Sequence, residues 1–374
     1  DGNRSGRGGV ARWAVLILLT VSVRGGVLLA VPDAVAGDPD DYRLLAENLL
    51  QHGVFGHGDV PTAYRPPLYP LILAATLALP IPDRLAVGLL HVGLGVATVV
   101  LARLLAERVA RPRTATLAAV LVAVDPILLG QSARVMTETL AALLAAAALL
   151  ALVEASRRKN AAAGAVAGAI IGLGALCRPV FLPLGVVAVF GLPWFASGAR
   201  SRLRIAAACF AGLLLAMAPW IVRNQLALGR PIIGTTHGGY TLLLGNNPSF
   251  YAYLRGETEN EVWDVRTWQR RRAGRAWEVA EASPAPSQGQ ESRDVTAITN
   301  QASPEVTADR ALYAEAWENI ARQPGMFAWA TLVRLGRLWA VAPHRAALGE
   351  GGWWAAAGWA IAVWYVGILV TGLL

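Results

Sequence analysis

The chain has 374 residues, of which 55% are hydrophobic and only 16% are charged, and its formal net charge is +8. With a mean hydropathy of +0.46, this composition excludes an ordinary water-soluble globular domain. The arginines stand in short clusters between apolar runs and form no continuous basic face, so no nucleic-acid partner is expected. Because apolar runs of about 20 residues cross a bilayer as helices, the sequence predicts an all-α polytopic membrane protein.

Seven apolar segments are predicted as membrane spans. They cover 13–31, 85–106, 114–131, 137–153, 161–176, 180–196 and 205–222. The basic clusters beside them are Arg4, Arg7 and Arg12; Arg108, Arg111 and Arg113; Arg157, Arg158 and Lys159; and Arg200, Arg202 and Arg204. An even number of crossings separates each cluster from the next, so the positive-inside rule assigns all four clusters to the cytoplasm.

Two short features qualify this topology. The apolar run 68–79 is closed by Pro80 and Pro82 and is too short to cross, so it is predicted as an interfacial or re-entrant helix. Residues 34–36 read Ala-Val-Ala and also fit a signal-peptidase site after the first segment. Arg24 inside that segment, and the spans that follow it, favour a retained helix.

Three parts are expected along the chain. A transmembrane module covers 1–222, and its first outer loop, 32–84, carries the candidate site. Residues 223–324 form a non-cytoplasmic loop region that is expected to be mostly irregular, above all at 283–304, which is rich in Ser, Pro, Gln, Asn and Thr. Residues 325–374 form C-terminal interfacial or transmembrane helices, which are expected to be incomplete.

The C-terminal part contains two helical patterns, and a third precedes it. Helical spacing returns at 305–322, just before it. Arg334 and Arg337 share one helix face within 325–343, so this segment either lies on the membrane surface or spans it with its arginines inward. The segment 353–374 is predicted to be transmembrane, and since it ends without a polar flank, a longer protein is expected.

The first outer loop is unusually polar. It contains Asp38, Asp40, Asp41, Glu47 and Asp59, and membrane proteins that place several carboxylates at the bilayer surface usually use some of them. Residues 40–51 are amphipathic and predict a juxtamembrane helix. Its apolar face would consist of Tyr42, Leu45, Ala46, Leu49 and Leu50.

Several motifs occur in a recognisable order. They are Asp38 four residues before Tyr42, the string LLAENLLQHGVF, Tyr64-Arg65-Pro66-Pro67, Glu138 in VMTETLAALL, Arg178-Pro179, Pro219-Trp220 with Arg223-Asn224, and Gly245-Asn246-Asn247-Pro248. From residue 10 to about 340 the chain resembles the GT-C glycosyltransferases of the protein O-mannosyltransferase and lipid A aminoarabinose transferase kind, which are similar to glycosyltransferase family 39.

The resemblance implies a GT-C-like helix bundle in the cytoplasmic (inner) membrane, with its active site facing outside. The donor would be a polyprenyl-phosphate-linked hexose or pentose, and the acceptor an envelope lipid, glycan or protein. In such enzymes the acceptor attacks the anomeric centre directly, so inversion of configuration is implied.

The resemblance also implies roles for individual residues. Asp38 would be the catalytic base, which the acceptor hydroxyl needs. Arg65 and Arg178 would bind the lipid phosphate, since a guanidinium suits a pair of phosphate oxygens, and both fall on the outer face in the seven-span topology. The supporting pocket residues would be Tyr42, Tyr64, Glu138 and Asn246.

Each role has a structural alternative. Asp38 precedes Pro39 and could be the N-cap of a helix with Asp41 at its third position, which would lower the basicity of the Asp38 carboxylate. Arg65 and Arg178 could be headgroup anchors. Asn246 and Asn247 either line the outer cavity or form an ordinary turn.

Glu138 opens an apolar run, where an unpaired carboxylate is costly. It either pairs with Arg134 one turn back or shares a pocket with Asp38 and helps to hold a divalent cation. No cofactor is otherwise implied. The histidines have no zinc-site spacing and are interpreted as structural or surface residues: His52, His57, His91, His237 and His344. Cys177 and Cys209 are expected to form neither a disulfide nor a metal site.

Other functional classes fit less well. The absence of Walker, GxGxxG and GxSxG motifs argues against a soluble nucleotide-sugar enzyme. A secondary transporter or lipid flippase is the main alternative, but it predicts internal repeats and charges near the midplane. A scaffold without activity of its own would leave the acidic loop without a purpose.

Overall fold

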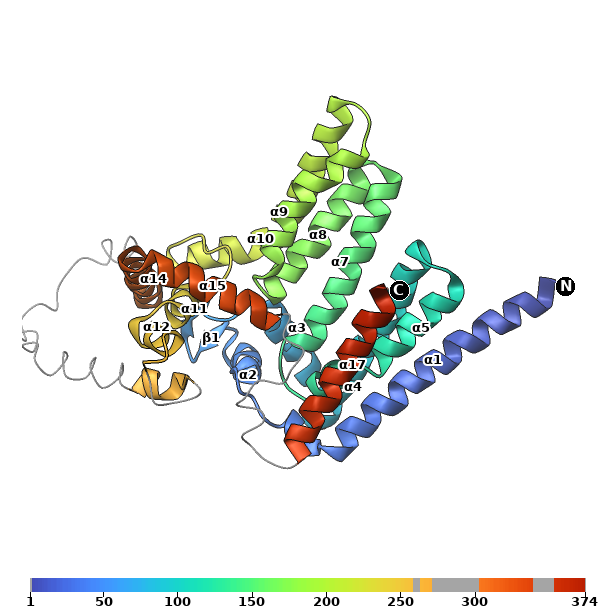
Figure 1. Cartoon of the computed structure of the whole chain (residues 1–374), viewed down its shortest axis with the longest axis horizontal. Helices are drawn as coiled ribbons and strands as arrows, with labels where there is room; N and C mark the ends of the chain where they lie inside the picture. The colour runs from blue at the N-terminus through green and yellow to red at the C-terminus, as the bar shows by residue number, and fades with distance from the viewer. Residues whose placement is uncertain (1, 258–262, 271–302, 339–352, 374) are drawn as a thin grey trace, which may run out of the picture. The chain divides into compact units, whose positions relative to one another are not determined.

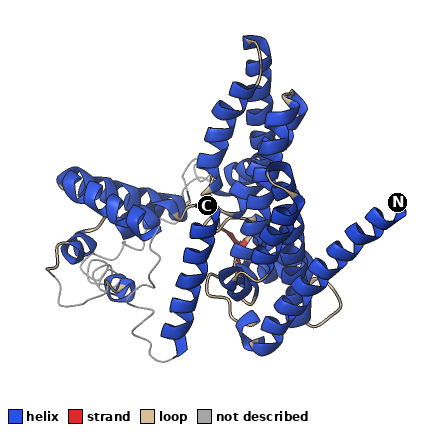
Figure 2. Ribbon diagram, turned by 45° about the vertical axis from the view of Figure 1, so that its right-hand side comes forward, coloured by secondary structure: helices blue, strands red, loops and turns tan. Residues whose placement is uncertain are grey.

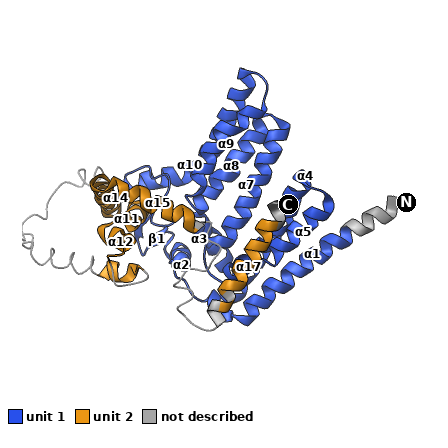
Figure 3. Ribbon diagram, viewed as in Figure 1, with its two compact units in different colours: residues 1–235 blue, residues 236–374 orange. Residues whose placement is uncertain are grey.

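The computed structural model describes residues 2–257, 263–270, 303–338 and 353–373. It divides into two compact units, Asp1–Thr235 (unit 1) and Thr236–Leu374 (unit 2) (Figures 1 and 3). The described chain is nearly all helical, with one two-stranded antiparallel hairpin in unit 1 (Figure 2). The predicted all-α fold class is therefore confirmed.

Unit 1 contains the candidate site and most of the apolar helices. Its elements are α1 (Gly2–Ala30), η1 (Pro32–Val35), α2 (Tyr42–His52), β1 (Gly56–His57), β2 (Val60–Pro61), α3 (Leu68–Leu77), α4 (Asp83–Val109), α5 (Pro112–Ala123), α6 (Pro126–Ser132), α7 (Glu138–Arg158), α8 (Ala161–Cys177), α9 (Phe181–Gly191), η2 (Leu192–Phe195) and α10 (Ala199–Leu228).

Among the described residues, four helices are long and apolar enough to cross a membrane, as expected for a polytopic protein. These stretches are Val10–Ala30, Asp83–Val109, Glu138–Arg158 and Ala199–Leu228. The bent pair α5 and α6 raises this number to five if it forms one span. As predicted from the run at 68–79, α3 is a separate short helix of 10 residues.

The span predicted at 114–131 consists of two helices, because the structure breaks it at Asp125. Helices α5 and α6 meet there at 47°. Pro126 cannot donate a backbone hydrogen bond to the preceding turn, and the Asp125 side chain instead accepts one from the Leu128 amide at 2.9 Å. Asp125 and Pro126 thus end one helix and begin the next.

Helices α8 and α10 pack closely and in parallel through small residues. A Cβ on Gly168 would lie 1.9 Å from the Cys209 carbonyl oxygen, and one on Gly212 would lie 2.1 Å from that of Ala165. Gly164 and Gly172 continue the same face of α8, which gives the small-xxx-small spacing of close helix pairs in membranes.

The parallel pairing constrains the two short apolar helices. Helix α8 has 17 residues and α9 only 11, fewer than a typical span. Since α8 and α10 run in the same direction, the chain must return along the bundle between them, and α9 with η2 makes this return (Figure 1). The seven-crossing topology stays a prediction, but the helix directions agree with it.

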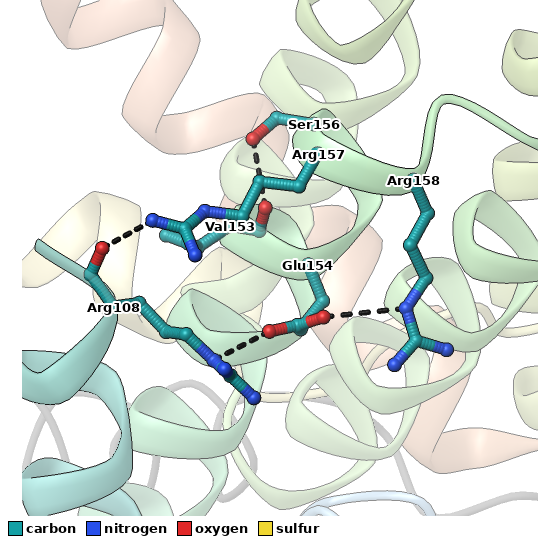
Figure 4. Close-up of polar contacts among 6 residues, drawn as sticks. All are labelled: Arg108, Val153, Glu154, Ser156, Arg157 and Arg158. Atoms are coloured by element: carbon teal, nitrogen blue, oxygen red, sulfur yellow. Dashed lines mark hydrogen bonds and ion pairs between the residues drawn. The ribbon is translucent and has the colours of Figure 1, made fainter.

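Basic clusters gather at one end of unit 1. Glu154 near the end of α7 pairs with Arg108 at 2.6 Å and with Arg158 at 3.2 Å, and Arg157 donates to the Arg108 carbonyl (Figure 4). Lys159, by contrast, lines a cavity together with residues of the 200–204 cluster. Three of the four basic clusters therefore share one end of the bundle, as the positive-inside rule requires of clusters on one membrane side.

Unit 2 consists of α11 (Gly238–Gly245), α12 (Pro248–Leu254), a short helix at 265–270, α14 (Pro304–Arg322), α15 (Pro324–Leu338) and α17 (Trp353–Leu373). Helix α14 confirms the helical spacing predicted at 305–322. The described part of 223–324 is more helical than the sequence indicated. Most of the segment 283–304 that was predicted to be irregular lies outside the described residues.

Arg334 and Arg337 lie on one face of α15, as their spacing predicted. Arg334 donates to the Gly245 carbonyl at 2.6 Å, and Arg337 lies 3.4 Å from the Tyr253 hydroxyl. Both arginines therefore face α11 and α12 within unit 2. The segment predicted at 325–343 is described only to Leu338, and whether it or α17 spans the membrane stays a prediction.

The packing of α8 on α10 predicts a position-specific stability effect. Gly168→Ala should lower the thermal midpoint in detergent, because a new Cβ would force the helices apart at a cost of about 1–3 kcal/mol. Gly93→Ala on α4 is the matched control, since nothing lies within 4 Å of the position that its new Cβ would take and Ala favours helix. Equal midpoints for the two variants would contradict the close contact.

Candidate active site

Asp38 lies just before the N-terminus of α2. The helix begins at Tyr42 and not at 40, because Asp41 has the left-handed conformation with φ of 61°. The predicted N-cap geometry, with Pro39 at the first helical position, is therefore wrong. Asp38 still serves the helix end, since its Oδ2 accepts a hydrogen bond from the Leu44 amide at 3.0 Å.

The other oxygen of the Asp38 carboxylate, Oδ1, is buried and, within the described residues, lacks a hydrogen-bond partner. Burial raises the pKa of Asp38, the amides of Leu44, Arg43 and Tyr42 lower it in part, and the charge of Asp41 raises it further. The net pKa lies above the usual range of an aspartate, so this carboxylate is a stronger base than a free one.

Tyr42 on α2 lies between Tyr69, which is near Asp38, and Arg65. Its ring packs edge-on against Tyr69 of α3, with centroids 5.6 Å apart, and the charge of Asp38 acts on the Tyr69 hydroxyl. The Arg65 guanidinium lies 5.6 Å from the Tyr42 ring centroid and 5.3 Å from that of Tyr64. Asp40 pairs with Arg65 at 2.9 Å.

The second arginine, Arg178, follows α8 and reaches the start of α7. Its Nη1 donates to Glu138 Oε1 at 2.5 Å and to the Thr137 hydroxyl at 3.2 Å. Thr137 also interacts with the Tyr42 hydroxyl, and the charge of Arg178 acts on that hydroxyl. Burial would lower the pKa of Arg178, but Glu138 more than compensates, so the pKa is raised and the group stays a cation.

The ion pair predicted between Glu138 and Arg134 is wrong. Glu138 is the first residue of α7, whereas Arg134 lies in the turn before it, so the two do not share a helix face. Arg134 is exposed, and Glu138 turns to Arg178 instead. The alternative, that Glu138 belongs to the polar cluster around Tyr42, agrees with this contact.

Six of the seven residues predicted for the site are thus connected through one cluster in unit 1: Asp38, Tyr42, Tyr64, Arg65, Glu138 and Arg178. The seventh, Asn246, lies in unit 2 and is 1% exposed. Its Oδ1 accepts from the Tyr251 hydroxyl at 3.1 Å, and Asn247 caps α12 by accepting from the Phe250 amide at 2.9 Å. These two asparagines form the turn between α11 and α12.

Sequence reasoning missed the residues that position the cluster. Asp40 holds Arg65, and only its place in the acidic loop could have indicated this. Arg223 of α10 donates to the Phe55 carbonyl at 2.6 Å and to the Thr62 carbonyl at 2.7 Å, so it fixes the hairpin before Arg65. Arg223 belongs to one of the motifs on which the family resemblance rests, but that motif alone does not indicate its role.

His91 is fully buried and structural, as predicted for the histidines. Its Nδ1 donates to the Ser132 carbonyl at 2.8 Å, and its Nε2 accepts from the Tyr69 hydroxyl at 2.8 Å. His344 lies outside the described residues. Both Cys177 and Cys209 are buried and free.

A divalent cation shared by Asp38 and Glu138 stays a prediction. Within the described chain, no group of three or more His, Cys, Asp or Glu side chains could hold a metal. Asp38 and Glu138 each have one buried oxygen without a partner, but Glu138 is already held by Arg178. Calcium takes about six to eight oxygen ligands, more than two carboxylates supply, whereas magnesium is often held by one or two carboxylates together with water and substrate phosphates.

A comparison with known protein families matches part of this helical membrane-protein fold. Residues 64–222 match the family model of the dolichyl-phosphate-mannose-protein mannosyltransferases. The resemblance inferred from the sequence is therefore confirmed over this stretch, which includes Arg65, Glu138 and Arg178 but not Asp38 or Tyr42. No curated protein matches the chain.

Proposed function

We propose that this protein transfers a sugar from a polyprenyl-phosphate-linked donor to an envelope lipid, glycan or protein on the non-cytoplasmic face of the inner membrane. The observation that carries the proposal is the buried, unpartnered Oδ1 of Asp38 in a cluster that also contains two arginines. A base and a cationic phosphate site are the two things that this chemistry requires.

The transfer is a direct displacement. The acceptor hydroxyl oxygen attacks the anomeric carbon while the bond from that carbon to the phosphate oxygen breaks. The hydroxyl proton passes to Asp38 Oδ1, and the lipid phosphate leaves with the bonding electron pair. Attack from the side opposite the phosphate inverts the anomeric configuration.

Arg65 and Arg178 would stabilise the departing phosphate. Each uses part of its guanidinium for a carboxylate partner, Asp40 or Glu138, and a guanidinium has five N–H donors. The remaining donors are available for phosphate oxygens, since the Arg178 side chain is 42% exposed and that of Arg65 is 19% exposed. The carboxylate partners orient both arginines before the donor binds.

The position of the cluster at one end of α7 supports an outward-facing site. Helix α7 has Glu138 at one end and Arg158 at the other, and its 21 residues span about 30 Å, the thickness of the hydrocarbon core. If the basic end is cytoplasmic, the cluster lies at the opposite surface, where a lipid phosphate and a water-soluble acceptor can meet. A transporter would instead require its site near the midplane.

Asp38→Asn separates catalysis from capping. The Asn side-chain oxygen can still accept from the Leu44 amide, so detergent stability and donor binding should stay close to wild type. The base is lost, so transfer from purified lipid-linked sugar in nanodiscs should fall by about 10²–10⁴-fold.

Asp41→Asn is the matched control, because Asp41 is exposed and Asn tolerates its left-handed backbone. It removes the same charge from the same loop and should retain most activity. Asp40→Asn is unsuitable, since Asp40 holds Arg65. Near-wild-type transfer by well-folded Asp38→Asn protein would show that Asp38 only caps α2.

The raised pKa of Asp38 predicts a pH effect. The carboxylate must be ionised to accept the proton, so kcat/KM should fall as pH decreases through a pKa above the ordinary value of about 3.9. The charge of Asp41 raises that pKa, so Asp41→Asn should move the acid limb of the profile to lower pH. An acid limb that does not move would assign it to another group.

Arg65→Ala and Arg178→Ala should each weaken donor use. Loss of one charge-assisted phosphate contact costs about 1.5–3 kcal/mol, which lowers kcat/KM for the donor by about 10-fold to 150-fold. A Lys at either position should restore part of the donor use, because it keeps the positive charge but lacks the paired N–H donors of a guanidinium. Arg84→Ala is the control, since Arg84 is exposed at the start of α4 and pairs with Asp33. Normal donor use by both site variants would make these arginines headgroup anchors.

A further inference from the structure

The basic end of unit 1 contains two adjoining cavities that the transfer reaction does not use. One, of about 580 Å³, lies at the start of α8 and α10 and is lined by Lys159, Asn160, Arg200, Ser201 and Arg204, among others. The other, of about 390 Å³, lies between α4, α7 and α8. Asn160 lines both cavities, so they adjoin at this residue.

The first cavity gathers positive charge without compensation. Lys159, Arg200 and Arg204 are exposed, and within the described residues none of their side chains has a hydrogen bond or an ion pair. The neighbouring Arg108 and Arg158 differ, because both share Glu154 (Figure 4). No carboxylate lines the first cavity, so a bound anion would relieve the repulsion among three cations.

The N-termini of two helices also favour an anion in this cavity. Helices α8 and α10 both begin at the cavity, with Ala161 and Ala199 in its lining. Asn160 accepts from the Ala163 amide, whereas α10 has no side-chain cap. The free amides and the positive dipole ends of the first turns favour a negatively charged group.

The second cavity indicates what the anion is attached to. Its lining is mainly aliphatic and includes Leu101, Leu150, Val166 and Ile170, and its charged lining residues, Glu154 and Arg158, form an ion pair with each other. Along α8 it runs from Ala162 to Ile170, which is about 12 Å at the rise of an α-helix. An apolar groove of this length beside an anion site suits the acyl chain of a lipid. A free phosphate would leave the groove unfilled.

We propose that the basic end of unit 1 binds an anionic glycerophospholipid. Its phosphate contacts Lys159, Arg200 and Arg204, and one acyl chain lies in the groove between α4, α7 and α8. Basic pockets between transmembrane helices recognise anionic lipid headgroups by this chemistry. The site lies at the opposite end of α7 from Glu138, so it does not depend on the proposed transferase activity.

The experiment compares two double variants that remove the same charge. Arg200→Gln with Arg204→Gln changes the cavity, whereas Arg111→Gln with Arg113→Gln removes two exposed arginines from another basic cluster. Each full-length protein is placed in phosphatidylcholine nanodiscs with or without phosphatidylglycerol. Retained phosphatidylglycerol is counted by native mass spectrometry, and thermal midpoints are measured.

Wild-type protein should retain phosphatidylglycerol and gain thermal stability from it. The cavity variant should bind it about tenfold more weakly or worse, and the control should match wild type. Lys159→Gly should also weaken binding without strain, because Lys159 has a left-handed φ of 51° that Gly adopts freely. Equal loss in the control would mean diffuse attraction and would overturn the site.

A second pair of measurements separates lipid from free anion. Val166→Trp should fill the groove and reduce phosphatidylglycerol retention, since Val166 is exposed and its replacement leaves the helix core intact. Inorganic phosphate should give no comparable rise in thermal midpoint. If phosphate stabilised the protein as well as the lipid does, or if Val166→Trp kept full lipid retention, the proposal of a lipid site would be wrong.

Discussion

The glycine-faced contact between α8 and α10 is the constraint on which the rest of unit 1 depends. A Cβ at Gly168 or Gly212 would meet the backbone of the other helix, so only glycine permits the two helices to pack this closely. Their parallel direction brings both N-termini to one end and obliges α9 to return between them. The same contact fixes the far end of α8, where Arg178 leaves the helix and reaches Glu138 on α7. The position of the phosphate-binding candidate is therefore a consequence of backbone packing deep in the bundle.

Capping and catalysis are not exclusive roles for Asp38, because they use different oxygens. Oδ2 accepts from the Leu44 amide, while Oδ1 is buried and free of partners in the described chain. Hydrogen bonds from the helix N-terminus lower basicity, but desolvation outweighs them and the pKa rises. A cap of this kind also orients the carboxylate, which a general base needs. The helix thus holds the candidate base in place without neutralising its function.

Composition and periodicity predicted the elements of the fold well, because a bilayer admits few alternatives to apolar helices. Local chemistry within those elements was harder to predict. The break at Asp125 depends on an Asp-Pro pair inside an apolar run, which a hydropathy window averages away. The start of α2 depends on one left-handed residue, Asp41. The contact of Glu138 with Arg178 joins positions forty residues apart in sequence, and no local spacing rule could select it over Arg134.

The break at Asp125 also explains how α1 can carry a charge inside the bundle. Arg24 is 2% exposed, and an arginine at that depth requires acceptors that a regular helix, whose carbonyls are already bonded, does not offer. Helix α6 is short, and it presents the Leu128 carbonyl and the Ser132 hydroxyl to Arg24. The Ser132 carbonyl fixes His91, which in turn holds the Tyr69 hydroxyl. Tyr69 packs against Tyr42 near Asp38, so the polar chain that gives the Arg24 Nη1 its acceptors also supports the candidate active site.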